Sequence, residues 1–398
     1  MQRIVFNSNL TVDHAICLPE FQDRYGASGA TSWGTEDKNL KAYNNVDDYF
    51  SNGVTATNSL SIMTGKEKMQ TYFSYANTTA KGIVDVNKLQ KHNITFRETA
   101  SLFNDRLTLD ANVNLMTQKI KNRPTSGGYY MNPLVGLYTF PRGEDLSAYR
   151  DNNGFEKYDE NRAMPLQNWY TDINGFNQNP YWLTNRVTSN DKRFRTLAAL
   201  SANLKINDWF SIQARGNVDY INDNYEQKMY AGTAADVAHQ NGRYIKMNRQ
   251  DFMIYGDVMA MFNKTWNDWT LNAAIGSSIN TTKVNSLSLD SGKSGLYKAN
   301  VFTVPNMNLG GAGTSFIDET ATKGVPSNPY SQRLRSVGKR VSTWMLPHAT
   351  TGPPRLPIPR AKIPDSSIRQ SAFHGLSTRL STCRNGSASA KCALPGHK

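Results

Sequence analysis

The sequence predicts an all-β protein: a partial antiparallel transmembrane β-barrel with short periplasmic turns and long extracellular loops. The first observation is alternation, because one face of a predicted strand carries Leu107, Leu109, Ala111, Val113 and Leu115, with polar residues between them. Strand side chains point to opposite faces in turn, so this strand has one apolar and one polar side. The second is turn chemistry, with Asn-Asp pairs at 104–105 and 207–208. The third is that such turns alternate with loops of tens of residues, as in outer-membrane barrels.

The same pattern places nine strands along residues 1–337. They are predicted at 4–12, 54–63, 69–79, 93–102, 107–118, 194–206, 210–221, 252–262 and 269–279. Long loops are predicted at 19–52, 119–191 and 281–323. Aromatic residues near the tight turns suit the girdle at a membrane interface; they are Trp209, Phe210, Trp266 and Trp269. A soluble β-sandwich whose core these aromatics cap is the alternative.

Alternation also assigns side chains to the two faces of the predicted wall. The residues expected to face lipid are Leu109, Val113, Leu200, Leu204, Ile212, Val258 and Leu271. Those expected to face the lumen are Asp110, Asn112, Arg215 and Asp219. No apolar run approaches the roughly 20 residues that a transmembrane helix needs.

The net charge of +13 does not indicate a nucleic-acid partner, because it is concentrated in one segment. Residues 332–398 contain 12 Lys or Arg and one acidic residue, Asp365, which leaves about +2 for the rest. The three cysteines, Cys17, Cys383 and Cys392, do not form a disulfide framework or a zinc motif. The histidines lack metal-ligand spacing and no catalytic motif is present, so we expect neither an enzyme nor a cofactor.

Aromatic residues in the predicted loop 119–191 are candidates for substrate binding. Their rings present apolar surface with polar tips, which suits stacking on sugars or peptide side chains. The candidates are Tyr129, Tyr130, Tyr138, Trp169, Tyr170, Tyr181 and Trp182. The alternative role is to pack the loop against the rim of the barrel.

Several segments resemble SusC/RagA-type TonB-linked outer-membrane proteins, in the family's order along the chain. They are FNSNLTVD from Phe6, LPEFQDRYG from Leu18, TYFSYANTTAKGIV from Thr71, HNITFRETASLFNDRLTLDANVN from His92, KNRPTSGGYYMNPLVGLYTFPRG from Lys121, NPYWLTNR from Asn179 and NGRY from Asn241. The resemblance implies a plugged outer-membrane barrel of about 22 strands. It also implies import of oligosaccharides or peptides, powered through TonB, with a SusD-like surface lipoprotein as lid.

The resemblance covers only the early strands of such a barrel. The N-terminus also lacks the pattern of a signal peptide, so Met1 is not expected to be the natural start. We therefore expect an internal fragment, without the plug, of a transporter that in its complete form resides in the outer membrane and contacts its lipids. The alternatives are a soluble secreted β-protein that binds glycans through its aromatic loops, and a non-functional truncated product with unpaired strand edges.

Residues 338–398 are predicted to be a disordered tail translated out of frame. Strand alternation ends near Val337, after which Pro, Ser and Arg accumulate. Back-translation of 343–352, started at the third base, permits LDVTARNDW, which resembles the family's next strand; the Trp344 and Met345 codons force its Asp. A natural disordered basic tail is the alternative. Resequencing the gene tests this prediction, which stop codons in the shifted frame would refute.

Overall fold

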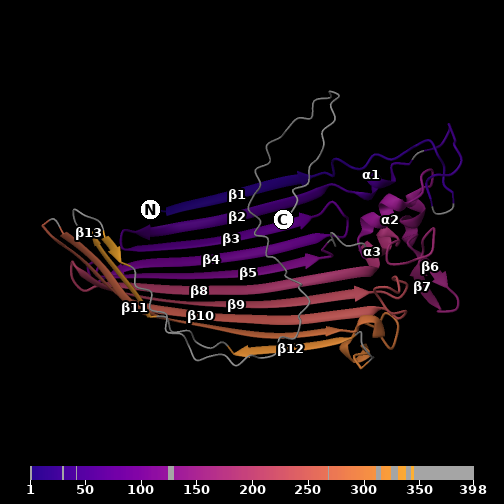
Figure 1. The fold of residues 1–398 in the computed structure, drawn as a ribbon. Coiled ribbons are helices and arrows are strands. Elements are labelled where there is room, and N and C mark those ends of the chain that lie inside the picture. Colours follow the sequence, from indigo (N-terminus) through magenta and orange to yellow (C-terminus); the bar gives the residue numbers. More distant parts are fainter. Residues whose placement is uncertain are drawn as a thin grey trace. The chain divides into compact units, whose positions relative to one another are not determined.

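The computed structural model describes residues 2–28, 31–41, 43–123, 130–267, 269–310, 315–323, 330–337 and 342–344, all within the compact unit Met1–Thr350. Nine long strands dominate it (Figure 1). They are β1 (Gln2–Asp13), β2 (Gly53–Lys66), β3 (Met69–Lys81), β4 (Lys88–Leu102), β5 (Leu107–Lys121), β8 (Val187–Lys205), β9 (Phe210–Met229), β10 (Arg243–Trp266) and β11 (Trp269–Asp290). Every one of the nine predicted strands is therefore present.

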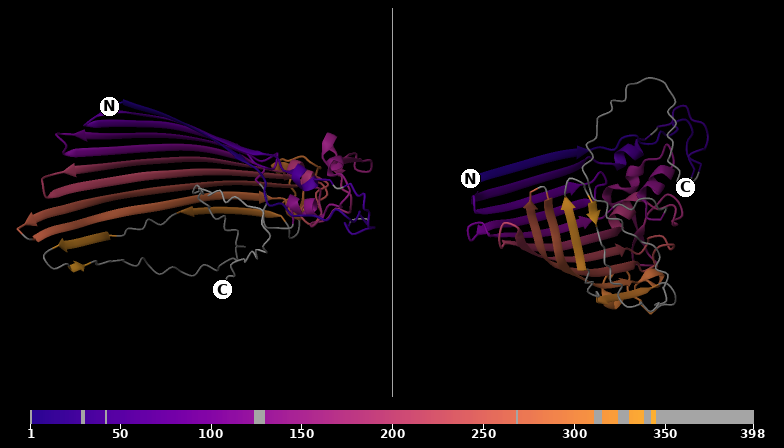
Figure 2. Two further views of the ribbon diagram at one scale, coloured as in Figure 1. Left: turned by 90° about the horizontal axis from the view of Figure 1, so that it is seen from above. Right: turned by 60° about the vertical axis from the view of Figure 1, so that its left-hand side comes forward.

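These strands form one antiparallel sheet in which neighbours in sequence are neighbours in space. The order is β1-β2-β3-β4-β5-β8-β9-β10-β11, continued by the short strands β13 (Tyr330–Val337) and β14 (Ser342–Trp344), while β12 (Phe316–Lys323) also pairs with β11. Within the described ranges, β1 and β14 do not pair with each other, so the sheet is open (Figure 2). Such a meander needs only local connections between strands.

Short connections occupy one end of the sheet, which we call the turn end. At residues 103–106, between β4 and β5, the backbones of Phe103, Asn104 and Asp105 have positive φ angles of 52°, 53° and 63°. Asn tolerates this conformation because its short polar side chain bonds locally. Between β8 and β9, Asn207 Oδ1 accepts hydrogen bonds from the backbone N–H groups of Trp209 (3.1 Å) and Phe210 (2.9 Å). The two predicted Asn-Asp turns are confirmed.

The opposite end, the loop end, contains the helices and long connections (Figures 1 and 2). The helices are α1 (Asn45–Tyr49), α2 (Pro133–Thr139) and α3 (Pro180–Arg186), with 3-10 turns η1 (Leu146–Tyr149), η2 (Asp151–Asn153), η3 (Gly292–Ser294) and η4 (Val304–Asn306). A small hairpin of β6 (Glu156–Asp159) and β7 (Met164–Gln167) lies in the same connection as α2 and α3. Among the described residues, no helix is long and apolar enough to cross a membrane.

The register gives the sheet two chemically different faces. One row of directly paired residues crosses six strands and consists of Phe73, Phe96, Val113, Ala198, Val218 and Ile254. Directly opposite residues of an antiparallel pair project from the same face, so these side chains share what we call the apolar face. The seven predicted lipid-facing residues lie on it, and the four predicted lumen-facing residues lie on the other, polar face.

Several predicted boundaries are wrong, mostly at the loop end. β4 and β5 extend to Lys88 and Lys121, β8 begins at Val187, and β11 continues to Asp290. The predicted loops 119–191 and 281–323 are therefore shorter, and part of the second is strand β12. The reason is physical: near the loop end polar residues occupy both faces, so hydropathy alternation fades, whereas the backbone ladder continues wherever a partner strand exists.

Residues 342–344 of the predicted tail pair with β13, and residues 345–398 lie outside the described residues. The domain boundary at 337 and the out-of-frame origin of the tail stay predictions.

Candidate functional site

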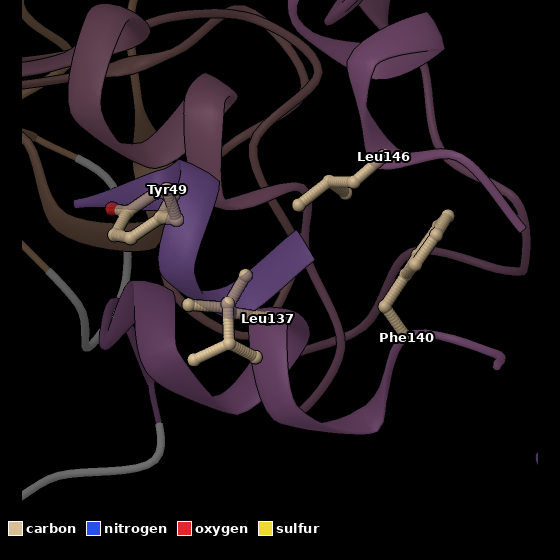
Figure 3. Close-up of a cluster of buried hydrophobic side chains, with 5 residues drawn as sticks. Tyr49, Leu137, Phe140 and Leu146 are labelled. Carbon is tan, nitrogen blue, oxygen red and sulfur yellow. The ribbon is translucent and has the colours of Figure 1, made fainter. Parts of the chain in front are cut away.

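The connections at the loop end pack into a compact body, which we call the loop cluster. Its largest buried group contains Val46 and Tyr49 of α1, Leu137 of α2, Phe140 directly after α2, and Leu146 of η1 (Figure 3). These residues come from segments nearly one hundred positions apart, and each is at most 6% exposed. Burial on this scale is what lets long connections hold a fixed conformation.

Both longer helices of the loop cluster begin at an Asn-Pro pair. Asn132 Oδ1 accepts a hydrogen bond from Leu134 N (3.0 Å), and Asn179 Oδ1 accepts one from Tyr181 N (2.8 Å). The following prolines occupy the first helical turn, where a missing N–H costs nothing. These two helix starts are the clearest signals in the sequence that the predicted loop 119–191 contains helices.

Buried polar side chains tie the connections together. Asn179 has no exposed surface; its side-chain N–H group donates to the carbonyl oxygens of Tyr149 (3.1 Å) and Asn168 (2.9 Å). Gln167 Oε1 accepts from Asn179 N at 2.8 Å. Gln178 Oε1 accepts from Ala234 N at 3.0 Å, which joins this connection to the one between β9 and β10. These hydrogen bonds between buried amides and distant backbone groups fix the relative position of the loops.

Trp182 and Tyr181, two predicted substrate-binding residues, face the interior of the loop cluster. Trp182 is 1% exposed, and its Nε1–H donates to Thr233 Oγ1 at 3.0 Å. Tyr181 packs against Tyr49, with ring centroids 5.4 Å apart, and burial raises the pKa of its hydroxyl to about 12. In this structure both side chains have the packing role that we considered as the alternative to ligand contact.

Trp169 and Tyr170 belong to a group of four rings. Their centroids are 4.7 Å apart, and Phe140 lies 5.4 Å from Trp169 and 5.1 Å from Tyr170. Tyr149 completes the group at 5.2 Å from Trp169. Both predicted residues are half-buried, so they contribute to the packing and retain some accessible ring surface.

Tyr130 is the most exposed of the predicted aromatics that the structure describes. It is 42% exposed and its ring lies 5.3 Å from that of Phe176, which is 54% exposed. Tyr138 is half-buried against Phe21 at 6.0 Å. Tyr129 lies outside the described residues. Phe176 was not predicted, and nothing in the sequence distinguishes it from the many aromatic residues around it.

The polar face of the sheet carries a series of paired charges. Arg193 and Asp223 are directly opposite each other on β8 and β9, joined by two bonds of 2.6 Å. Further pairs between neighbouring strands are Arg97–Asp110, Arg195–Asp219, Arg215–Asp257 and Arg243–Asp290. Bidentate guanidinium–carboxylate bonds fix both partners in direction as well as distance.

The carboxylates of these pairs are the more enclosed members. The side chain of Asp257 is only 4% exposed, although that of Arg215 is 46% exposed. The guanidinium groups therefore cover the carboxylates and present their remaining donors outward. A wall of this kind can hydrogen-bond a polar solute or a polar protein surface without a net charge of either sign. The sequence predicted the polar face but could not assign the partners.

Within the described ranges, no group of three or more His, Cys, Asp or Glu side chains is close enough to hold a metal ion. Two surfaces that the structure offers a polar or aromatic-binding solute are the polar face and the exposed part of the loop cluster.

A meander of long strands with tight turns at one end, long packed connections at the other, and opposite polarity on its two faces is the wall of an outer-membrane-type β-barrel. Solved structures agree with this class. The RagAB peptide importer in its closed-closed state matches with a TM-score of 0.60 and 14% identity, over 85% of this chain and 40% of that chain. Its open-open state matches with a TM-score of 0.59 at the same identity and coverage.

The chain thus spans about two fifths of the length of the importer chain that it matches. At this identity the likeness establishes the fold alone, which is all-β, with an open antiparallel sheet that corresponds to part of a β-barrel. No protein-family profile and no curated protein match the sequence.

Proposed function

We propose that this chain is part of the barrel of a TonB-dependent outer-membrane transporter that imports peptides or oligosaccharides. The observation that carries the proposal is the exposed apolar face of the sheet. Phe6 is 67% exposed and Leu200 is 56% exposed, and similar residues continue the surface from β1 to β11. A continuous apolar surface of this size marks a face that contacts lipid or protein rather than water.

The dimensions of the apolar face support a membrane. On β5 its apolar residues run from Leu107 to Leu115, a length of roughly 27 Å at about 3.4 Å per residue. A strand tilt of about 40° reduces this to roughly 21 Å along the membrane normal, close to the ~25 Å apolar band of outer-membrane barrels. The soluble glycan-binding alternative would leave this surface in water.

If the apolar face contacts the membrane, the polar face and the loop cluster have roles in transport. The polar face with its Arg–Asp pairs lines the lumen, and the loop cluster lies on the outer surface of the cell, where Tyr130 and Phe176 are accessible to substrate. The complete protein works with TonB and with a SusD-like surface lipoprotein over the loops, as the sequence resemblance implies. Long connections face outward in such barrels and short turns face the periplasm.

Uptake by cells that express the complete protein tests the proposal. Labelled peptides of mixed sequence and labelled oligosaccharides are offered separately to cells with and without TonB. We expect TonB-dependent depletion of one class, and the class depleted identifies the substrate. Equal depletion with and without TonB for both classes would refute the proposal.

Topology is tested in the same cells with single cysteines. In the complete protein with every native cysteine changed to Ser, the variants Phe176→Cys at the loop end and Asn207→Cys at the turn end are treated with an impermeant maleimide. Labelling of the first in intact cells, and of the second only after permeabilisation, is expected. The reverse pattern would invert the proposed orientation.

A further inference from the structure

Four lysines gather on the apolar face at the point where it becomes polar near the loop end. Lys88 of β4 is directly opposite Lys121 of β5, and Lys119, two residues along β5, is directly opposite Lys192 of β8. Opposite residues are about 5 Å apart and residues i and i+2 about 7 Å apart, so the four ammonium groups arise from one small area. All four side chains are exposed. We call this group the lysine cluster.

Among the residues that the structure describes, the lysine cluster lacks an ion-pair partner. Within the described part of the chain, no carboxylate forms an ion pair with any of the four. The nearby acids are engaged elsewhere, Asp85 with Lys81 at 2.9 Å and Glu226 with Lys228 at 3.3 Å. Like charges directly opposite each other in a sheet are destabilising. An anion at this place removes that cost.

Two lysines at the turn end differ in this respect. Lys205 pairs with Asp208 at 3.0 Å, and Lys264 lies over the rings of Trp209 and Trp266 at 5.5 Å and 5.2 Å. What distinguishes the loop side of the apolar face is that four lysines gather there, on the side that the proposed topology places in the outer leaflet.

A shallow depression of about 360 Å³ adjoins the lysine cluster. Lys119 and Lys192 line it together with the neutral hydrogen-bonding groups of Gln90, Thr117 and Asn224, and with the ring of Phe194. The next row toward the turn end is Ile94, Leu115, Thr196 and Tyr220, where the apolar surface starts. From the loop end toward the turn end, the strands thus present first the lysines, then neutral hydrogen-bonding side chains, and then apolar side chains.

We propose that the lysine cluster binds the phosphate groups of a phosphorylated lipid of the outer leaflet, with the acyl chains lying on the apolar rows below. The inference rests on the proposed function, because it requires this face to meet lipid. The positive charge of the lysine cluster complements a phosphate, and the depression is continuous with the apolar face. A lipid phosphate is therefore favoured over free phosphate, because only the lipid has acyl chains that contact the apolar rows. Lysine near an anionic membrane surface contributes enough to change affinity about fivefold per residue.

Lipid titration of the full chain, refolded in neutral detergent micelles, tests the inference. The probe is bisphosphorylated lipid A, compared with the same lipid after enzymatic dephosphorylation, and native mass spectrometry measures the bound fraction. The test variant is Lys119→Gln/Lys192→Gln. The matched control, Lys66→Gln/Lys298→Gln, removes the same charge from exposed lysines outside the lysine cluster.

The wild-type chain is expected to prefer the phosphorylated lipid. The test variant should bind this lipid about thirtyfold more weakly than the wild-type chain, whereas the control variant should change the affinity less than twofold. Equal binding of both lipids, or equal loss in test and control variants, overturns the inference. Displacement by millimolar inorganic phosphate would show an adventitious ion site only, and also overturns it. Insertion of the chain into neutral phosphatidylcholine vesicles, measured separately, distinguishes this inference from the proposed function. If the chain inserts but does not prefer the phosphorylated lipid, only the lipid-binding inference is wrong. If the chain does not insert into vesicles at all, both the lipid-binding inference and the proposed function are refuted.

Discussion

Substituting Leu200 by Arg is the most direct test of the two-faced wall. Leu200 is directly opposite Ala111 on one side and Gly216 on the other. Ala111 is the middle member of the five apolar positions that β5 contributes to this face. Leu200 therefore lies near the middle of the apolar band, where the small neighbours offer an arginine neither a carboxylate nor a polar surface.

The expected cost follows from that depth. Arginine on the lipid face of an outer-membrane barrel costs about 2–4 kcal/mol at the midplane and falls to ~0–1 kcal/mol near the interfaces. Because Leu200 lies near the middle of the apolar band, we expect the midplane cost of about 2–4 kcal/mol. This corresponds to roughly a 30- to 1,000-fold change in the folding equilibrium constant. Asn203→Arg is the matched control, because Asn203 is three residues away on the polar face, opposite Thr108 and Gln213.

Folding of the full chain into phosphatidylcholine vesicles, followed by tryptophan fluorescence against urea, measures both variants. We expect Leu200→Arg to lower the free energy of unfolding by the stated amount and Asn203→Arg to change it by less than ~1 kcal/mol. Equal costs at the two positions would refute the assignment of the faces. A larger cost at Asn203 would reverse it.

Three further predictions concern the loop cluster and the polar face. Trp182→Ala should destabilise the loop cluster by about 3–5 kcal/mol, seen as faster limited proteolysis at the loop end, whereas Thr233→Val, which removes only the hydrogen bond, should cost about 1–3 kcal/mol; equal costs would contradict the packing role. Arg215→Ala should cost about 1–3 kcal/mol because it leaves the enclosed Asp257 carboxylate without its partner, and adding Asp257→Asn should recover much of this loss in a double-mutant cycle. Burial raises the pKa of Tyr181 to about 12 from the ordinary 10.0, so its contribution to stability is complete below pH 10 and is lost as the pH rises toward 12; a phenolate absorbance at pH 10 in Tyr181, identified by its loss in Tyr181→Phe, would contradict this.

The local features of the fold could be predicted from the sequence. Alternation in a stretch such as 107–115 identifies a strand and both of its faces, because the two-residue period of a strand does not depend on what surrounds it. Asn-Asp at 104–105 and 207–208 locates the turns, since these residues tolerate the backbone conformations of a tight reversal. The order of the strands then followed, because short turns force sequential strands to be neighbours.

The roles of the loop residues were decided by the tertiary structure. Trp182 and Tyr130 are both aromatic residues of one predicted loop, yet the first is buried under Thr233 and the second is exposed beside Phe176. Burial depends on which distant segments meet, and α1, α2 and η1 meet through side chains about a hundred positions apart. No local pattern contains that information.

Partners across the sheet were likewise decided by register. The sequence by itself determined that Arg215 lies on a polar face and that Lys119 and Lys192 lie near the ends of a predicted loop. Only the tertiary structure places Arg215 directly opposite Asp257 and Lys119 directly opposite Lys192, because the pairing of β9 with β10 and of β5 with β8 fixes which residues face each other. A shift of one residue would move every side chain of a strand to the other face, and it is disfavoured because it would place polar residues among the apolar residues of the neighbouring strands. Hydropathy therefore decides which face of the sheet a side chain lies on. The register between neighbouring strands decides which charged side chains are directly opposite each other, and so whether they attract or repel.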